Sequence, residues 1–292
     1  MRSLFASTLV STLQKQSSPT KRLISKPFIL INKANALTIT VQLRENAVLS
    51  MIDPTTLALA SLIIFCGALT QSLIGFGLAI VASPLLYIVD PELVPAPVII
   101  MGFSISLLTL FRERGALEFN GLQYALLGRI PGGFLGAGLL IYAPQPILGL
   151  AISGIVATAV ILSLLKFNIA VNRKSLFGAG VISGVFGNIA AIGGPPLAIL
   201  LSGKDARQFR AALSAFFIFS SLIALVILGI TGLLSIKHLW LSLLLLPSVI
   251  LGYVVAGRLI GHVDKDKTRK ATLILCSICA TILAVKSLME LG

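Results

Sequence analysis

Charged side chains are scarce in this chain of 292 residues: lysine, arginine, aspartate and glutamate together make up 11% of it. A soluble domain carries roughly 25% charged residues. Here 57% of the residues are hydrophobic, and the mean hydropathy is +1.02. This shortage of charge excludes an ordinary soluble domain. It predicts an all-α polytopic membrane protein whose surroundings are the lipid bilayer.

Acidic residues are especially few, at 10 against 23 basic ones, which gives a formal net charge of +13. Such an excess can indicate nucleic-acid binding, but most of the basic residues fall in the first fifty positions or in short loops between apolar runs, as the positive-inside rule describes. No nucleic-acid partner is therefore expected. The acids outside the N-terminal region and the last loop lie in loops or at segment edges, so no carboxylate is an obvious proton carrier. They are Asp90, Glu92, Glu113, Glu118 and Asp205, together with Glu290 near the end of the chain.

Cysteine and histidine are too rare to build a disulfide framework or a metal centre. The cysteines are Cys66, Cys276 and Cys279, and the histidines are His238 and His262. Because the Cys276-x-x-Cys279 pair has no third ligand nearby, we expect it to pack on one face of the last helix. The chain also lacks Gly-x-Ser-x-Gly, His-Glu-x-x-His and paired acids. We predict that it is not an enzyme and holds no cofactor or metal.

Residues 1–50 differ from the rest because they are basic, rich in serine and threonine, and carry Glu45 as their one acid. We expect a disordered or mis-assigned N-terminal extension in front of a transporter domain at residues 51–292. An organellar transit peptide has the same composition. The chain could also start at Met51, which leads directly into the first apolar run.

Eight apolar segments follow the extension, and most reach the ~20 residues that a membrane-spanning helix needs. They cover approximately residues 57–90, 93–111, 121–142, 146–165, 176–202, 211–232, 238–261 and 271–289. At one constant offset Gly75 corresponds to Gly187 and Pro84 to Pro196, and at a slightly larger one Pro131 corresponds to Pro247. We therefore predict two four-segment repeats, at about 55–166 and 175–290.

Each repeat contains a glycine- and proline-rich stretch inside its first apolar segment. The second copy runs from Gly187 to Pro196, through Gly193-Gly194-Pro195-Pro196, and the first runs from Gly75 to Pro84. Glycine frees the backbone, and a proline at the first helical position wastes no hydrogen-bond donor. We predict that each helix breaks inside the membrane and restarts at the proline. Such a break survives only if it lines a cavity or is buried in protein, and the restarted helix aims its positive dipole end there, which suits an anion.

The positions of the basic loops favour hairpins over simple crossings. The loops before and after the fifth segment are both basic, although a full crossing would place them on opposite sides of the membrane. The arm after the second break, Pro195 to Ser202, spans about 12 Å, too short for a ~30 Å core. We predict six crossings plus two re-entrant hairpins, with inverted repeats and every strongly basic loop in the cytoplasm. Eight plain crossings with parallel repeats are the alternative.

Arg129 is the sharpest candidate for a substrate-binding residue. It lies well inside the third segment, just before Pro131-Gly132-Gly133. An ionisable side chain at that depth indicates a functional site, and a guanidinium can hold an oxyanion with two hydrogen bonds. The alternative is that Arg129 snorkels to the membrane interface.

Polar side chains in or near the breaks are the other candidates for contacting substrate. Asn188 and Ser83 lie inside the breaks, and Gln71 lies one turn before the first. Either Asn188 or Ser83 could instead cap a half-helix, and Ser83 is placed as an N-cap before Pro84. Gly132, Gly133 and Gly136 are expected to serve close helix packing. The break residues expected to shape the site through their backbone are Gly75, Gly77, Pro84, Gly187, Gly193, Gly194, Pro195 and Pro196.

At these motifs the chain resembles the sulfite exporter TauE/SafE family of membrane permeases. The resemblance rests on Gln71-Ser72-Leu73-Ile74-Gly75-Phe76-Gly77 with Ser83-Pro84-Leu85, and on Gly184-x-x-Gly187 followed by Ile192-Gly193-Gly194-Pro195-Pro196-Leu197. It implies a secondary transporter for sulfite, a sulfonate or another small organic anion, usually at a bacterial plasma membrane. If residues 1–50 are a transit peptide, an organellar membrane is expected instead.

The first copy departs from the motif, because Ala82-Ser83 stands where the second has Gly194-Pro195. This departure puts in doubt that both hairpins bind substrate equally. The alternative function is a non-transporting membrane scaffold or assembly subunit, which would gain nothing from a guanidinium beside a backbone break. The sequence leaves open the coupling ion, proton or sodium, and the oligomeric state.

Overall fold

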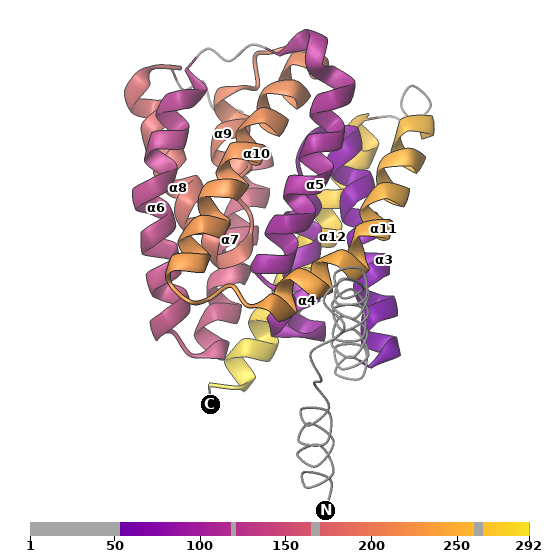
Figure 1. Cartoon of the computed structure of the whole chain (residues 1–292), viewed down its shortest axis with the longest axis vertical. Helices are drawn as coiled ribbons and strands as arrows, with labels where there is room; N and C mark the ends of the chain where they lie inside the picture. The colour runs from indigo at the N-terminus through magenta and orange to yellow at the C-terminus, as the bar shows by residue number, and fades with distance from the viewer. Residues whose placement is uncertain (1–52, 118–120, 165–169, 260–264, 292) are drawn as a thin grey trace, which may run out of the picture. The chain divides into compact units, whose positions relative to one another are not determined.

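The computed structural model describes residues 53–117, 121–164, 170–259 and 265–291, so the extension predicted at residues 1–50 lies outside it. Every regular element in the described residues is helical, which confirms the all-α class. Within these described ranges, seven helices are long and apolar enough to cross a membrane. In chain order (Figure 1) the elements are α3 (Pro54–Ile74), α4 (Leu78–Val89), η1 (Pro91–Leu93), α5 (Ala96–Glu113), η2 (Arg114–Ala116), α6 (Leu122–Tyr142), α7 (Gln145–Leu164), α8 (Arg173–Ala190), α9 (Pro195–Leu200), α10 (Ala206–Ile230), α11 (Ile236–Leu259) and α12 (Lys265–Met289).

The first and fifth predicted segments are each split into two helices, as their motifs predicted. Residues 75–77 separate α3 from α4, and residues 191–194 separate α8 from α9. Gly75 and Gly77 have φ angles of 108° and 131°, which residues with side chains rarely adopt. The N–H of Gly75 still bonds the carbonyl of Gln71, so α3 ends in a left-handed cap before the chain turns back.

The helices that follow the two breaks, α4 and α9, begin at different points of their motifs. Helix α9 begins at Pro195, as predicted, but α4 begins at Leu78 and contains Pro84 in its interior. The prediction of a restart at Pro84 is therefore wrong. Two positive-φ glycines reverse the chain within three residues, and the side chain of Gln71 accepts the first free N–H, from Leu78 at 3.3 Å. A helical start thus becomes possible six residues before the proline.

Ser83 consequently lies inside α4. The expectation that it is placed as an N-cap before Pro84 is therefore also wrong. Its Oγ donates a hydrogen bond to the carbonyl of Ala190, the last residue of α8. The serine therefore joins one broken helix to the other.

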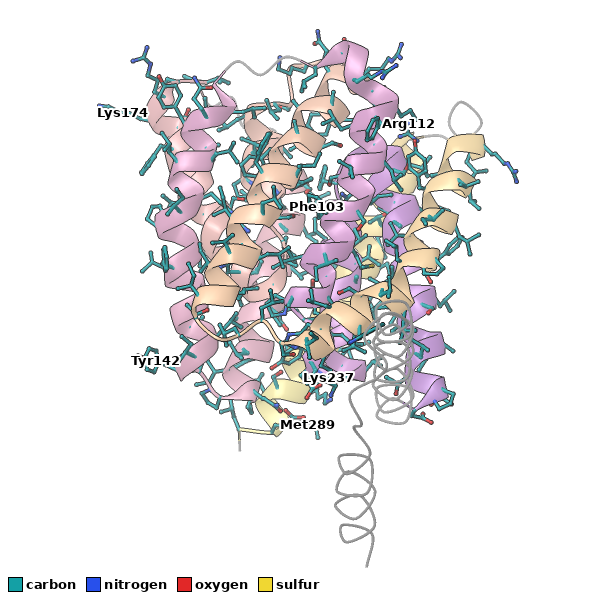
Figure 2. The ribbon with its side chains drawn as sticks, in the orientation of Figure 1. Phe103, Arg112, Tyr142, Lys174, Lys237 and Met289 are labelled. Atoms are coloured by element: carbon teal, nitrogen blue, oxygen red, sulfur yellow. The ribbon has the colours of Figure 1, made fainter. Side chains whose placement is uncertain are left out.

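Each hairpin returns to the end of the helical bundle from which it started. The two hairpins start from opposite ends. Figure 2 places Arg112 and Lys174 at one end, and Tyr142, Lys237 and Met289 at the other. We call the first the basic end. Helix α8 starts there, and after α9 the chain enters α10 at the same end, because Arg207 and Arg210 of α10 pair with Glu113 beside Arg112.

The first hairpin starts and ends at the other end of the bundle, opposite the basic end. Glu92, just after α4, pairs with Lys237, and the carbonyl of Ile88 accepts from Nζ of Lys286, both at the end opposite the basic end. Helix α3 rises from that same end, where its indigo start is seen in Figure 1. By length α3 could cross a membrane, yet α4 returns alongside it. Helix α8 is not among the seven spans.

The closest helix packing joins the two halves of the chain. Helix α6 packs on α8, α3 on α11, α5 on α10, and α7 on α12. Between α6 and α8 the contact is made by glycines, because a Cβ at Gly132 would lie 2.0 Å from the carbonyl oxygen of Val181 and one at Gly180 would lie 2.0 Å from that of Ala125. Membrane helices approach this closely only where small residues face each other. The packing role expected for Gly132 is thus confirmed.

Replacing Gly132 with alanine should therefore destabilise the protein, since overpacking a tight contact costs about 1–3 kcal/mol. We expect a lower midpoint of thermal unfolding in detergent and less monodisperse protein after purification. Gly138→Ala on the same helix is the matched control, because nothing lies within 4 Å of a side chain added there. Equal midpoints for the two variants would contradict the close α6–α8 contact.

Candidate functional site

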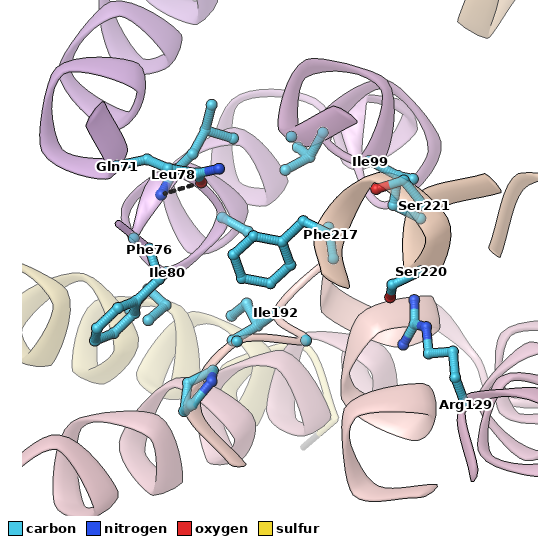
Figure 3. A pocket seen from close by; sticks show the side chains of 18 residues that line it. Gln71, Phe76, Leu78, Ile80, Ile99, Arg129, Ile192, Phe217, Ser220 and Ser221 are labelled. Carbon is cyan, nitrogen blue, oxygen red and sulfur yellow. Dashed lines mark hydrogen bonds between the residues drawn. The ribbon is translucent and has the colours of Figure 1, made fainter. Parts of the chain in front are cut away.

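The two helix breaks meet in the interior of the bundle and enclose a cavity. Leu78 and Ile80 at the start of α4 belong to the same apolar cluster as Ile189 and Ile192 around the second break. The cavity beside them has a volume of about 40 Å³ (Figure 3). It is lined by Gln71, Phe76, Gly77, Leu78, Ala79 and Ile80 around the first break, Val98, Ile99 and Gly102 of α5, Arg129 of α6, residues 191–195 of the second break, and Phe217, Ser220 and Ser221 of α10.

Arg129 is the one charged residue in this lining, and it is 3% exposed. Its Nη1 donates to the backbone carbonyl of Ser183, and its Nη2 lies 3.4 Å from Oδ1 of Asn188. Its Nε is buried and has no hydrogen-bond partner, and no ion pair to it is found in the described parts of the chain. The side chain therefore does not snorkel to the surface of the bundle, and its role in binding substrate stays a prediction.

Gly187 makes room for this guanidinium. A Cβ on Gly187 would lie 2.1 Å from Nη1, 2.5 Å from Nη2 and 2.7 Å from Cζ of Arg129. Such distances are far inside van der Waals contact, so only glycine leaves the space that the guanidinium occupies. Gly187 thus serves to leave space for a neighbouring side chain, whereas the role expected of it was to shape the backbone of the break.

The groups that hold Arg129 are themselves tied to the second break. Nδ2 of Asn188 donates to the carbonyl of Gly133 at 2.9 Å, which fixes its amide against α6. Oγ of Ser183 donates to the carbonyl of Gly193 at 2.7 Å, while the carbonyl of Ser183 accepts from Arg129. The position of the guanidinium is therefore linked to the conformation of the break.

The cavity can hold an anion chemically. A buried guanidinium with a free N–H can form charge-assisted hydrogen bonds to an oxyanion. The hydroxyls of Ser220 and Ser221 have no hydrogen-bond partner among the described residues, so they are available as donors. In Figure 3 the guanidinium of Arg129 points toward the hydroxyl of Ser220, while the rings of Phe76 and Phe217 lie away from it.

A comparison with known families identifies the chain. The family profile described as sulfite exporter TauE/SafE matches residues 59–283. The chain belongs to this family. It is accordingly a multi-pass membrane transporter and not an enzyme, as the motifs at the two breaks predicted. Searches of curated proteins and of solved structures returned no match.

The TauE/SafE match includes both hairpins and every predicted site residue. Six of those residues line the cavity: Gln71, Gly77, Arg129, Gly193, Gly194 and Pro195. Six are not part of its lining: Gly75, Ser83, Pro84, Gly187, Asn188 and Pro196. Among the latter, Gly187 and Asn188 hold Arg129, and Gly75 faces Arg210 of α10, whose Cγ would lie 2.9 Å from an added Cβ.

Gln71 lines the cavity and also holds the first break through its amide. Its Nε2 donates to Oγ of Ser106 at 3.1 Å and its Oε1 accepts from the N–H of Leu78. Both ends of its amide are thus used inside the TauE/SafE protein. Its amide joins the first break to α5.

Sequence reasoning missed the α10 residues and the aromatic part of the lining. Ser220 and Ser221 are adjacent hydroxyl residues within an apolar segment, a signal that could have identified them. Phe76 and Phe217 carry no such signal, because an aromatic residue in a membrane helix usually faces lipid or another helix. Ser183 was missed because its backbone, not its side chain, bonds Arg129.

The described residues of this TauE/SafE protein contain no group of three or more His, Cys, Asp or Glu side chains that could hold a metal ion. Cys276 and Cys279 are buried in α12 as free thiols, where packing was expected of them. The chemistry of the cavity is therefore that of one guanidinium, neutral hydrogen-bond donors and apolar side chains.

Proposed function

We propose that this TauE/SafE protein is a secondary transporter that carries a small singly charged anion, such as sulfite in its hydrogen sulfite form, a sulfonate or another organic acid, through the cavity beside Arg129. One observation carries the proposal: a buried guanidinium without a carboxylate partner lines a cavity between two helix breaks. An unpaired buried charge is expensive, and ionisable groups inside membranes mark substrate or ion pathways. A bound anion supplies the missing partner.

The composition of the lining favours a singly charged substrate with a small apolar part. Arg129 neutralises one negative charge, and Ser220 and Ser221 offer neutral donors to further oxygens. Phe76, Phe217 and the aliphatic residues around them would contact a methyl or methylene group but would leave a second charge unpaired. Small alkyl sulfonates and monocarboxylates fit this pattern better than sulfate does.

The start of α4 supports an anion at the same place. Gly77, Leu78, Ala79 and Ile80 line the cavity, so the amino end of a 12-residue helix faces it. The positive end of the helix dipole attracts negative charge within the first turn. Helix α9, with 6 residues, contributes less by this mechanism.

We further propose six crossings and two re-entrant hairpins, arranged as inverted repeats. Exchanging the two halves of the chain turns the α6–α8 contact into α11–α3, and leaves the α5–α10 and α7–α12 contacts unchanged. The hairpins start from opposite ends, as an inverted duplication requires. The positive-inside rule then directs the basic end toward the cytoplasm, in a bacterial plasma membrane.

Flux measurements in proteoliposomes test the proposal. We expect the wild type to move methanesulfonate, and labelled sulfite at an acidic pH where hydrogen sulfite predominates. Sulfate should move at least about tenfold more slowly, because its second charge would be left unpaired. Gly193→Leu should abolish the flux, since its Cβ would lie 2.8 Å from Oγ of Ser183 and 3.8 Å from Nη1 of Arg129, so the larger side chain would disturb the anion site. Gly203→Leu is the control, in an exposed loop with nothing within 4 Å of an added Cβ.

Absence of flux in the wild type with either a proton or a sodium gradient would overturn the choice of substrate. Equal flux in wild type and Gly193→Leu would overturn the choice of pathway. In the latter case the scaffold alternative would still be excluded, because the protein would be transporting.

A further inference from the structure

A buried cluster of charges lies at the basic end, where α5 ends and α10 begins. Glu113, the last residue of α5, is 4% exposed, and Arg210 of α10 is 7% exposed. Nε and Nη2 of Arg210 donate to Oε1 of Glu113 at 3.0 and 2.8 Å, and Nε of Arg207 donates to Oε2 at 3.2 Å. Nε of Arg112 lies 3.4 Å from Oε1. The Glu113 carboxylate thus forms ion pairs with three arginines.

The cluster also holds the turn of the first hairpin. Nη1 and Nη2 of Arg112 donate to Oγ and the carbonyl of Ser72 at 3.1 and 2.9 Å, at the end of α3. Arg210 packs on Gly75, the first residue of the break. The end of α3, the end of α5 and the start of α10 are therefore bound to one another through Glu113 and its arginines.

This cluster adjoins the cavity. The ring of Phe209, next to Arg210 in the chain, packs edge-on against the ring of Phe76, with centroids 6.2 Å apart. Phe76 lines the cavity, as do Ile99 of α5 and Phe217 of α10. The same two helices that Glu113 and Arg210 join are thus cavity walls, and an opening between them at the basic end would lead into the cavity.

The opposite end of the α5–α10 pair is closed differently. There the two helices meet through an apolar cluster made by Ala96 and Ile99 of α5 and Ala224 and Leu228 of α10. The ion pair between Glu92 and Lys237 at that end is partly exposed and does not join α5 to α10. A buried ion pair therefore fastens these two helices at the basic end only, within the described residues.

We infer that the Glu113–Arg210 ion pair is the gate of the anion pathway at the basic end. While the pair is formed, it holds α5, α10 and the first hairpin together and closes the cavity on that side. When it separates, that side opens. An arriving anion can take the place of the Glu113 carboxylate, because three arginines share a single negative charge. This inference rests on the proposed function, because it takes the cavity beside Arg129 to be the route of the anion.

Cysteine accessibility tests the gate without requiring transport. The native cysteines are first removed by Cys66→Ser, Cys276→Ala and Cys279→Ala. The reporter cysteine is then introduced as Gly102→Cys, because Gly102 lines the cavity and nothing lies within 4 Å of an added Cβ. A membrane-impermeant maleimide is added to inside-out or right-side-out vesicles. We expect Glu113→Gln and Arg210→Gln to raise the labelling rate from the basic end roughly tenfold or more, with no rise from the opposite end.

Two further variants separate a gate from a general loss of stability. Glu92→Gln, which breaks the ion pair at the opposite end, should leave labelling from the basic end unchanged. Arg207→Ala removes only the arginine that is 73% exposed, so it should keep the fold and raise the rate less than Glu113→Gln. Unchanged rates in folded Glu113→Gln and Arg210→Gln, or an equal rise from both ends, would overturn the gate.

The same measurement in an Arg129→Ala background distinguishes this inference from the proposed function. The rise in labelling should persist there even though no anion is carried. If wild-type flux is absent but the one-sided rise is present, the substrate proposal fails and the gate stands. If flux is present and the rise is absent, the gate fails and the substrate proposal stands.

Discussion

Replacing Arg129 with alanine is expected to abolish anion flux while leaving membrane insertion unchanged. The variant removes the one charge in the cavity lining and with it the charge-assisted hydrogen bonds to the substrate. Removing one partner of a buried hydrogen-bonded charge pair costs about 2–5 kcal/mol, so substrate affinity should fall by roughly 30-fold or more. Flux of sulfite and methanesulfonate in proteoliposomes, normalised to inserted protein, measures the loss.

Two companion variants show whether the guanidinium itself matters. Arg129→Lys keeps the charge but loses the planar donor fork, so we expect flux between those of wild type and Arg129→Ala. Arg258→Ala is the matched control, because Arg258 lies exposed in the last turn of α11. Full flux in Arg129→Ala, with correct insertion, would show that the anion passes elsewhere.

Replacing Gly187 with alanine is expected to have nearly the same effect through a single added methyl group. The new Cβ would lie 2.1 Å from Nη1 of Arg129, so either the guanidinium or α8 must move. Displacing the guanidinium breaks its bonds to Ser183 and Asn188 and spoils the anion site. We expect loss of most flux, with destabilisation of about 1–3 kcal/mol from overpacking. Flux and the thermal unfolding midpoint are both measured.

A double variant tests that the two residues act through one another. If Gly187→Ala acts by displacing Arg129, then Gly187→Ala combined with Arg129→Ala should be no less stable than Gly187→Ala alone, because the clash is gone. Gly178→Ala is the control on the same helix, with nothing within 4 Å of the added methyl. Additive destabilisation in the double variant would contradict the close contact of Gly187 with the guanidinium.

Several features were predictable because they depend on composition or on neighbouring residues. Low charge and long apolar runs indicate membrane helices wherever they fold. Gly75 and Gly77 permit positive φ, and Pro195 favours a first helical position, so both breaks could be placed from local backbone preferences. The basic loops on each side of the fifth segment predicted that it enters and leaves at one end, and the ion pairs of α10 with Glu113 place it so.

The errors arose where a distant side chain overruled a local preference. Pro84 and Ser83 were expected to begin α4, but Gln71 accepts the N–H of Leu78 and the helix starts there. Glu113 was expected at a segment edge, where it does lie, yet three arginines from two helices bury its side chain. No pattern around Glu113 in the chain indicates that burial.

The sequence by itself determined the class of protein, the two breaks and the presence of an arginine at depth in the third segment. Only the tertiary structure decided that Arg129 shares one cavity with both breaks, that Gly187 leaves room for it, and that Phe217, Ser220 and Ser221 line the same cavity. The physical reason is the distance along the chain over which each feature is determined. Hydropathy and backbone freedom belong to each residue and its neighbours, whereas a cavity is formed by helices far apart in the chain, whose facing residues are chosen by packing.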